Sequence, residues 1–380
     1  MMARCTHRTR AVPVWAVLAV CLLACLAAGR AQAVPDMGEE PLLSAEAVHA
    51  VAWLPDSRAL AVTTDRALVL VEPTGPRVLL EAHGVLSPDR GAILFADTAG
   101  RLHLQNVEDG AVLDLGLQGA APQWAPRVRR FAFYSSGACP PASAPNTAPY
   151  CPPAALVTAD LDSGELTPLV PGAGPQGNFA WLAGASDVVY YHDGILGVAH
   201  MDSATDTVLT RVAPFPCPAQ AFCRPSVAAA RNAPRAAAFL FNDRDGDGAW
   251  GPGDAAALWA FDTATGAILH TDQRAWFLSA EERASGLWPR GITWSPDGTA
   301  LCYTGRDEHG FYLMFHSFAG DMPPTLLRMQ GRPELPRWSP DGDAVAYVLV
   351  RDDAYASTGT MSELRLVRFA DRDGDVQPGE

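Results

Sequence analysis

A turn phrase with a fixed pattern of apolar and polar residues recurs along the chain. Residues 294–298 read Trp-Ser-Pro-Asp-Gly and precede an apolar run that ends at Tyr303, and residues 338–342 repeat the phrase before a run that ends at Tyr347. Proline presets φ for a turn, glycine accepts positive φ, and aspartate can accept hydrogen bonds from the following backbone N–H groups. Each phrase therefore predicts a tight turn between two strands.

Five further segments keep the same phase with a weaker match. The seven anchor positions are Trp53, Leu86, Trp124, Trp181, Asn232, Trp294 and Trp338. Successive anchors lie 33 to 62 residues apart, with short apolar runs between them. Such spacing is typical of the four-stranded blades of a β-propeller. A β-sandwich also has short strands, but it is not expected to repeat one turn phrase in phase. The Trp residues at this position are expected in the core.

The two ends of the chain predict how the ring closes. Residues 40–43 stand before Trp53 as residues 324–327 stand before Trp338, in the position of an outer strand. The last repeat has no outer strand of its own, so the N-terminal strand can complete it and remove two open sheet edges. The sequence thus predicts an all-β chain whose residues 34–380 form one seven-bladed β-propeller. Six blades are the alternative if the Asn232 anchor is false.

The N-terminus has the pattern of an export signal. Residues 1–13 carry three Arg and no acidic residue, residues 14–28 are apolar, and Ala31-Gln32-Ala33 has the form of a cleavage site. A run of this length is short for a membrane span but suits a signal peptide at 1–33. Lipoprotein processing at Cys25 is the alternative. We expect a periplasmic or secreted, monomeric protein with no transmembrane segment in the mature chain.

Charge restricts the class of partner. The net charge is −14, and removal of residues 1–33 takes away four Arg and no acid, which leaves −18. All 28 basic residues are Arg, so lysine-dependent chemistry such as a P-loop or a Schiff base is excluded. An acidic chain without a basic cluster also argues against nucleic acid and anionic lipid as partners.

The cysteines suggest an oxidising compartment. Cys139 and Cys151 bracket one Pro-rich stretch, and Cys217 and Cys223 bracket another. Two local disulfides, Cys139–Cys151 and Cys217–Cys223, are the natural interpretation for an exported chain. Cys302, within an apolar run, is expected to be a buried free thiol.

An acidic segment is the sharpest chemical signal. Asp243, Asp245, Asp247 and Asp254 fall at positions 1, 3, 5 and 12 of a calcium-loop pattern, with Gly248 at position 6. Ala249 would offer its carbonyl oxygen. We expect calcium here; the alternative is a solvated acidic turn. A second, weaker site is expected at the C-terminus, where Asp371, Asp373 and Asp375 repeat the start of the loop.

The Trp-Ser-Pro-Asp-Gly phrase resembles the repeat of TolB-type β-propellers. The resemblance is strong over about 290–350 and weaker elsewhere. It implies the propeller fold for this chain. TolB carries an N-terminal α/β domain ahead of its propeller; we expect no such domain here, so a role in the Tol–Pal system is not carried over.

Two functional classes follow. The first is an exported, non-enzymatic scaffold that binds an envelope protein or peptide at a loop-lined face or central channel. The second is a propeller enzyme, a lyase or hydrolase, with its site at the channel mouth. The second class requires a converging His, Glu and Asp set, and no such set is evident from spacing: the His residues are scattered. We therefore expect binding rather than catalysis.

Overall fold

The protein is described by a computed structural model. It describes residues 36–37, 41–137, 154–174, 178–182, 184–203, 205–212, 226–249, 254–276, 290–319, 323–352 and 359–369. Residues Met37–Arg368 form one compact unit. The second unit, Met1–Asp36 with Phe369–Glu380, has only Asp36 and Phe369 among the described residues.

The described residues form strands and no helix. The strands of the first half are β1 (Asp36–Met37), β2 (Leu43–Ala45), β3 (Val48–Trp53), β4 (Leu60–Thr64), β5 (Leu68–Glu72), β6 (Gly75–Leu80), β7 (Val85–Leu86), β8 (Ala92–Ala96), β9 (Arg101–Asn106), β10 (Val112–Trp124), β11 (Arg130–Ser135), β12 (Ala155–Asp160), β13 (Leu166–Pro171) and β14 (Asn178–Trp181). Those of the second half are β15 (Asp187–His192), β16 (Ile195–His200), β17 (Thr205–Arg211), β18 (Val227–Ala229), β19 (Arg235–Asn242), β20 (Ala255–Asp262), β21 (Ile268–Trp276), β22 (Ile292–Trp294), β23 (Ala300–Asp307), β24 (Gly310–Ser317), β25 (Thr325–Arg328), β26 (Arg332–Trp338), β27 (Ala344–Asp352) and β28 (Thr360–Arg368).

Consecutive strands pair antiparallel in groups of four. The groups are β3–β6, β7–β9 with the first half of β10, the second half of β10 with β11–β13, β14–β17, β18–β21 and β22–β25, and a last group in which β26, β27 and β28 are joined by β2. Neighbouring residues in the inner strands are buried on both faces, as in β4, where all five are buried. This burial on both faces explains why the sequence shows little strand alternation.

One long strand belongs to two groups. β10 pairs with β9 through residues 112–118 and with β11 through residues 119–124. Its register shifts within 114–117 and within 120–123, where Gly116 and Ala121 have positive φ. These irregularities bend the strand from one sheet into the next.

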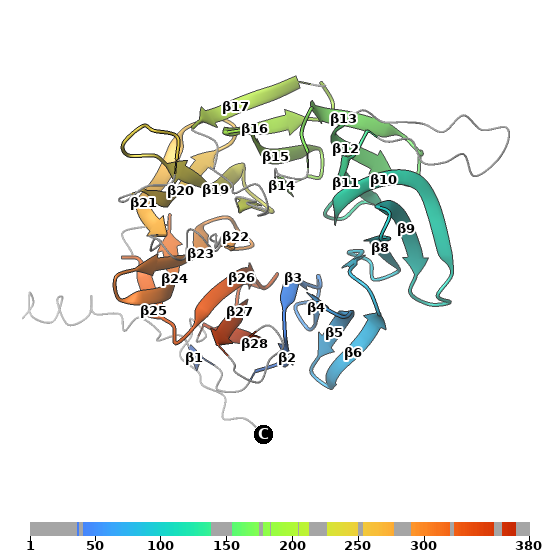
Figure 1. The fold of residues 1–380 in the computed structure, drawn as a ribbon, viewed down its shortest axis with the longest axis horizontal. Coiled ribbons are helices and arrows are strands. Elements are labelled where there is room, and N and C mark those ends of the chain that lie inside the picture. The colour runs from blue at the N-terminus through green and yellow to red at the C-terminus, as the bar shows by residue number, and fades with distance from the viewer. Residues whose placement is uncertain are drawn as a thin grey trace, which may run out of the picture. The chain divides into compact units, whose positions relative to one another are not determined.

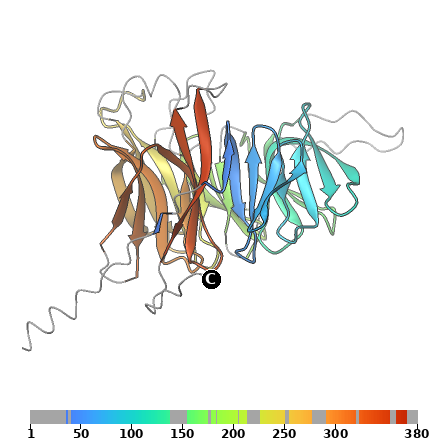
Figure 2. The ribbon, with the colours of Figure 1, turned by 90° about the horizontal axis from the view of Figure 1, so that it is seen from below.

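The groups stand around a common axis, each with its first strand innermost (Figure 1). The innermost strands contact one another in the order β14, β18, β22, β26 and β3. In side view the strands run roughly along this axis (Figure 2). Apolar side chains fill the space between adjacent groups, as where Val62 of β4 and Val348 of β27 share one core cluster.

The N-terminal part of the compact unit pairs with its C-terminal part. In β2, Leu43, Ser44 and Ala45 lie opposite Leu364, Glu363 and Ser362 of β28. The Leu42 N–H extends this pairing by donating to the Leu364 carbonyl at 2.8 Å. The paired strand β2 (Leu43–Ala45) begins later than the predicted outer strand at 40–43.

The turn phrase has one repeated hydrogen-bond pattern. Ser295 Oγ donates to Asp297 Oδ1 at 2.5 Å, and the same oxygen of Asp297 accepts the Thr299 N–H at 3.0 Å. The Ala300 N–H in turn donates to Ser295 Oγ at 2.8 Å. Equivalent bonds occur at Ser339, Asp341 and Ala344, and at Ser87, Asp89 and Ala92. The serine and aspartate of the phrase therefore satisfy backbone N–H groups of the turn.

The tryptophans at the anchor position are only partly what the sequence predicts. Trp181 and Trp294 are buried, as expected for core residues. Trp53, Trp124 and Trp338 are only half-buried, although Trp53 and Trp124 pack against core clusters. Their ring N–H groups donate to backbone carbonyls: Trp53 to Arg337, Trp124 to Val85 and Trp338 to Gly342.

Candidate functional site

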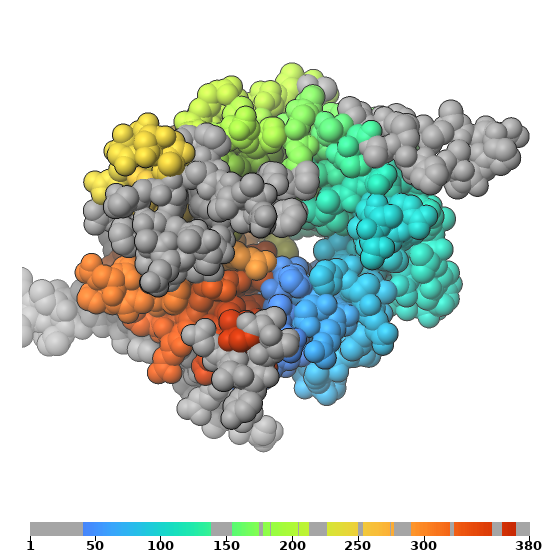
Figure 3. Space-filling view, in the orientation of Figure 1, coloured from blue at the N-terminus to red at the C-terminus, as the bar shows by residue number. Residues whose placement is uncertain are grey.

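The acidic segment follows β19 and precedes β20. β19 is buried and ends at Asn242, so the chain leaves the sheet at Asp243, where the acidic residues begin. Gly246 and Gly248 adopt φ values of 77° and 71°, which glycine accepts without strain. The two glycines turn the segment back on itself, and Figure 3 shows it in yellow on the face in view.

Three of the predicted carboxylates converge. Oxygen atoms of Asp243, Asp245 and Asp247 lie within 4.8 Å of one another. Both oxygens of Asp243 also accept backbone N–H groups, from Gly246 at 2.7 Å and from Gly248 at 2.9 Å. Asp247 accepts the Ala249 N–H at 2.7 Å. Oxygen ligands in this number and spacing suit a hard divalent cation such as calcium.

The charges of the three carboxylates act on one another. The backbone N–H of Asp247 favours the charged form of Asp245, but desolvation and the charges of Asp247, Asp254 and Asp243 outweigh it and raise the pKa of Asp245. The pKa of Asp243 is lowered, because its hydrogen bonds from Gly248 and Gly246 outweigh desolvation. A bound cation would relieve the repulsion at Asp245.

Asp254 takes a different position from the other three. Its side chain is fully buried, whereas Asp245 and Asp247 are exposed. Its Oδ1 accepts the Arg244 N–H at 2.9 Å, so it ties the start of the loop to its end. The structure does not place Asp254 among the three converging carboxylates, and the Ala249 carbonyl stays a predicted ligand.

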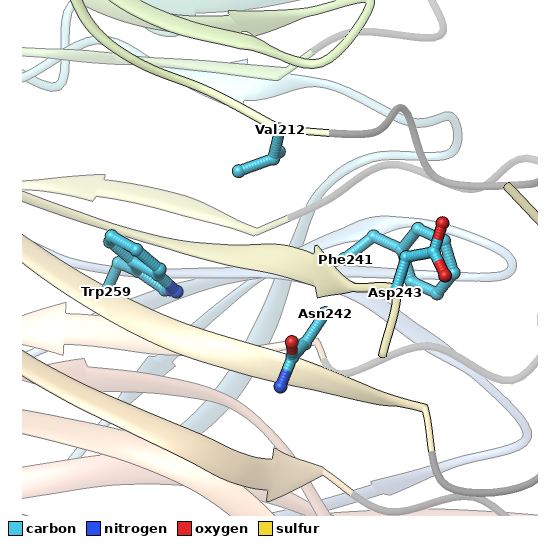
Figure 4. Close-up of a pocket in the computed structure, with 5 residues that line it drawn as sticks. All are labelled: Val212, Phe241, Asn242, Asp243 and Trp259. Carbon is cyan, nitrogen blue, oxygen red and sulfur yellow. The ribbon is translucent and has the colours of Figure 1, made fainter. Parts of the chain in front are cut away.

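A small cavity borders the first residue of the loop. It has a volume of about 280 Å³ and is lined by Val212, Phe241, Asn242, Asp243 and Trp259 (Figure 4). Val212 follows β17, Phe241 and Asn242 end β19, and Trp259 lies in β20. The cavity thus lies between two neighbouring sheets, with aromatic walls and the Asp243 carboxylate at one side.

Comparison with solved structures decides the fold. Over 98% of its length the chain superimposes on 98% of a chain from the crystal structure of the mitotic checkpoint complex, with a TM-score of 0.56 and 14% identity. It also covers the whole of the β-propeller domain of Myceliophteria thermophila Cps50 (Swd1) with 89% of its own length, at a TM-score of 0.52 and 11% identity. The chain has a β-propeller fold.

At sequence identities of 14% and 11%, these comparisons establish the fold but not the function. No protein-family model matches the chain, and no curated protein is similar to it in sequence.

Several predicted sites lie outside the described residues. They are the signal peptide at 1–33 with Cys25, the cysteines Cys139, Cys151, Cys217 and Cys223, and the second acidic segment with Asp371, Asp373 and Asp375. Cys302 is the one cysteine in the described ranges, and it is a buried free thiol whose burial raises its pKa well above the ordinary value.

No helix in the described part of the chain has the length and apolar character to cross a bilayer.

Two pairs of histidines that the sequence does not predict to be close have their rings in contact. The rings of His49 and His83 have centroids 4.8 Å apart, and those of His270 and His316 stack at 4.0 Å. The members of each pair lie 34 and 46 residues apart in the sequence, so no local spacing could show them. Only the folded arrangement of the chain brings them together. Within the described ranges, Asp243, Asp245 and Asp247 form the one group of at least three acidic, His or Cys side chains close enough to share a metal ion.

Proposed function

We propose that this chain is an exported, non-enzymatic β-propeller of the TolB type that binds a protein or peptide partner in the cell envelope. The resemblance of the turn phrase and the signal-like N-terminus support export and the TolB-type family. Propellers bind partners through the loops at the ends of their strands, because a rigid ring holds these loops in place.

The strand groups support seven blades closed by the N-terminal strand. Each four-stranded group would be one blade, and β2 would be the outer strand of the blade formed by β26, β27 and β28. The pairing of Leu43 with Leu364 favours this closure. A ring closed in this way has no open sheet edge at the junction of its two ends.

One observation carries the binding proposal: the two ends of the strands differ. The tight Trp-Ser-Pro-Asp-Gly turns join first strands to second strands and so lie at one end of the sheets. The acidic loop joins the second strand β19 to the third strand β20, so it lies at the opposite end. The longest connections, after β11, β17 and β21, also leave the strands at that opposite end. Variable, long connections on a rigid scaffold are where recognition usually occurs.

We further propose that calcium stabilises the loop of Asp243, Asp245 and Asp247 on this face. The convergence of three carboxylates and the raised pKa of Asp245 support a cation, and the glycines at 246 and 248 support the compact loop. Asp254 would stabilise the loop through its hydrogen bond from the Arg244 N–H rather than bind the ion directly. Modest affinity suffices where ambient calcium is high, as outside the cell.

Affinity capture from envelope extracts tests the proposal. The mature protein is used as bait with calcium and with chelator, beside a variant in which Asp243, Asp245 and Asp247 are all changed to Asn. A partner that crosslinks to the wild type in calcium, and less to the variant, supports the proposal. Turnover of glycan or peptide that is abolished by Glu334→Gln, which changes a buried carboxylate of the inner strand β26, would instead establish the enzyme alternative.

A further inference from the structure

Two exposed histidines meet where the first strand group passes into the second. His49 is the second residue of β3, a strand that borders the centre of the ring (Figure 1), and His83 lies in the connection between β6 and β7. Their ring centroids are 4.8 Å apart, and the ring planes are tilted by 44°. β3 begins and β6 ends away from the tight turns. The pair therefore lies at the same end of the sheets as the acidic loop.

The spacing of the two rings suits a shared metal ion. Imidazole nitrogen binds zinc at about 2.0–2.1 Å, so two imidazoles that ligate one ion at a tetrahedral angle have ring centres roughly 5 Å apart. The observed separation of 4.8 Å lies close to this value. Both side chains are exposed, so an ion can reach them from solvent. The pair needs little rearrangement to take up an ion.

The hydrogen bond of His83 is a second, independent observation. Its Nε2 lies 3.4 Å from the backbone carbonyl oxygen of Asp65. Because a carbonyl oxygen can only accept, Nε2 carries the proton, and the lone pair of the neutral ring lies on Nδ1. Histidines that ligate metals usually donate their other ring N–H to a carbonyl or carboxylate oxygen in this way. His83 thus has the tautomer and the supporting hydrogen bond of a metal ligand.

Backbone contacts with β4 hold both histidines in place. Ala47, two residues before His49, accepts the Asp65 N–H at 3.1 Å, so the start of β3 is tied to the turn after β4. Thr63 Oγ1 of β4 donates to the carbonyl of Gly84, the residue after the second histidine, at 2.9 Å. One strand therefore positions both rings, and little conformational entropy is lost when an ion binds.

The charges around the pair leave His49 in the form that binds metal. Partial desolvation, and then the charges of His83 and Arg290, lower the pKa of His49, whereas Asp65 acts in the opposite direction. Because the ordinary value is about 6.5, a lowered pKa keeps this ring neutral at pH 7, as a ligand must be. The charge of Arg290 is offset by an ion pair with Glu334 at 3.4 Å.

We propose that His49 and His83 together bind one divalent transition-metal ion, with His83 ligating through Nδ1. Imidazole nitrogen suits Zn²⁺, Ni²⁺ and Cu²⁺, whereas calcium prefers oxygen ligands, so this site differs in chemistry from the acidic loop. Within the described ranges, no third His, Cys or acidic side chain lies close enough to join the two in one ligand set. The other positions of the ion are open to water or to a donor group of a bound molecule. The metal site goes beyond the proposed scaffold function and does not depend on it.

Isothermal titration calorimetry with Zn²⁺ tests the proposal. The mature protein is titrated in excess calcium, which occupies the acidic loop, and is compared with His49→Phe and His83→Phe. Phenylalanine keeps an aromatic ring at each position but offers no nitrogen. We expect one Zn²⁺ per chain and a rise in Kd of at least about tenfold in each variant, because even the loss of an outer hydrogen-bond partner costs this much affinity. His309→Phe, which changes an exposed histidine elsewhere, is the matched control and should leave the Kd unchanged.

Two further measurements support the assignment. Long-range proton–nitrogen NMR spectra of the zinc-loaded protein should show His83 coordinated through Nδ1, with the proton on Nε2. Cu²⁺ should displace Zn²⁺, as the usual order of affinities for nitrogen ligands requires, whereas Mg²⁺ should not. Thermal melts of all variants check that the fold is retained.

Three results would overturn the proposal. They are an absence of saturable Zn²⁺ binding to the wild type, an unchanged Kd in His49→Phe or His83→Phe, and an equal rise in Kd in His309→Phe. Zinc binding that is lost in Asp245→Asn but kept in both histidine variants would place the ion in the acidic loop and would also contradict it. Each of these results leaves the scaffold function standing, because that function is tested by capture of a partner.

Discussion

The ring N–H of Trp53 donates a hydrogen bond to the carbonyl oxygen of Arg337 at 2.8 Å, across 284 residues of sequence. In the opposite direction, Arg337 Nε donates a hydrogen bond to the carbonyl oxygen of Val51 at 3.0 Å. Side chains of the first and last strand groups are thus hydrogen-bonded to each other's backbone.

Trp53→Phe should destabilise the protein by about 1–2 kcal/mol, because it leaves the Arg337 carbonyl without this donor. The matched control is Trp294→Phe, at the same repeat position. Trp294 is buried, and its ring N–H has no hydrogen-bond partner among the described residues. Trp294→Phe removes more buried ring area but no hydrogen bond, so equilibrium urea unfolding of the two variants compares the hydrogen bond with the loss of packing. No loss of unfolding free energy in Trp53→Phe would show that the Trp53–Arg337 bond contributes nothing.

The turn phrase provides a test of glycine in two equivalent positions. Gly298 and Gly342 have φ values of 72° and 91°. A Cβ on Gly298 would lie 2.6 Å from the Cβ of Ala233 in the neighbouring group, whereas one on Gly342 would have no atom closer than 3.9 Å. Gly298→Ala should therefore lower the melting temperature more than Gly342→Ala. Both substitutions place a Cβ on a residue with positive φ, which strains the backbone, but only Gly298→Ala also creates a clash. Equal shifts would indicate that the two groups move apart easily.

Much of the fold could be predicted because the turn phrase carries its own hydrogen bonds. Ser295, Asp297 and Gly298 act within a few residues of one another, so their pattern is visible in the sequence. All seven anchors come at or just after the end of a strand. The half-burial of Trp53 and Trp124 could not be foreseen, because it depends on the distance between sheets rather than on local pattern.

The candidate site was predictable to the same degree. Asp243, Asp245 and Asp247 converge because a short loop places alternate residues on one side, which spacing alone reveals. The separate role of Asp254 depends on its burial beneath the loop, where it accepts the Arg244 N–H. The members of the two histidine pairs lie far apart in the sequence, and only the arrangement of the sheets assembles them.

The aspartates of the turn phrase predict a loss of stability in acid. Hydrogen bonds from Ser295 and Thr299 outweigh desolvation and lower the pKa of Asp297, and the same pattern lowers the pKa of Asp341. A carboxyl whose pKa is lower in the folded state stabilises the protein above its unfolded value, about 3.9, and this contribution is lost as the pH falls through the folded value. Urea unfolding between neutral pH and pH 3 should therefore show a steeper decline in the wild type than in the Asp297→Asn, Asp341→Asn double variant. Parallel curves would contradict the prediction.

Calcium should stabilise the protein through the acidic loop. A ligand that binds only the folded state adds about 2.7 kcal/mol of unfolding free energy at a concentration one hundred times its Kd. We expect millimolar calcium to raise the melting temperature of the wild type and chelator to reverse the rise. Asp245→Asn should reduce the response, because Asp245 is one of the three converging carboxylates. Asp262→Asn, at an acidic turn elsewhere in the same strand group, is the control and should keep it. No shift with calcium in the wild type would remove the site.

The stacked pair His270 and His316 predicts a second pH dependence, at higher pH. Burial lowers the pKa of His270, although Asp272 partly opposes it, and burial and then the neighbouring His270 lower the pKa of His316. His270 Nε2 and His316 Nδ1 are buried without a hydrogen-bond partner among the described residues, and the rings pack against Phe318. Histidines whose pKa is lowered by folding stabilise the protein above about pH 6.5, where they are neutral in both states, and this stability is lost as the pH falls through the folded values. Unfolding free energy should therefore decline between pH 7 and pH 5, and His316→Phe, which keeps the stacked ring but cannot be protonated, should flatten the decline. His309→Phe, which changes an exposed histidine, is the control. Part of the decline should remain in His316→Phe, because burial still lowers the pKa of His270. A decline as steep in His316→Phe as in the wild type would show that His316 does not sense pH.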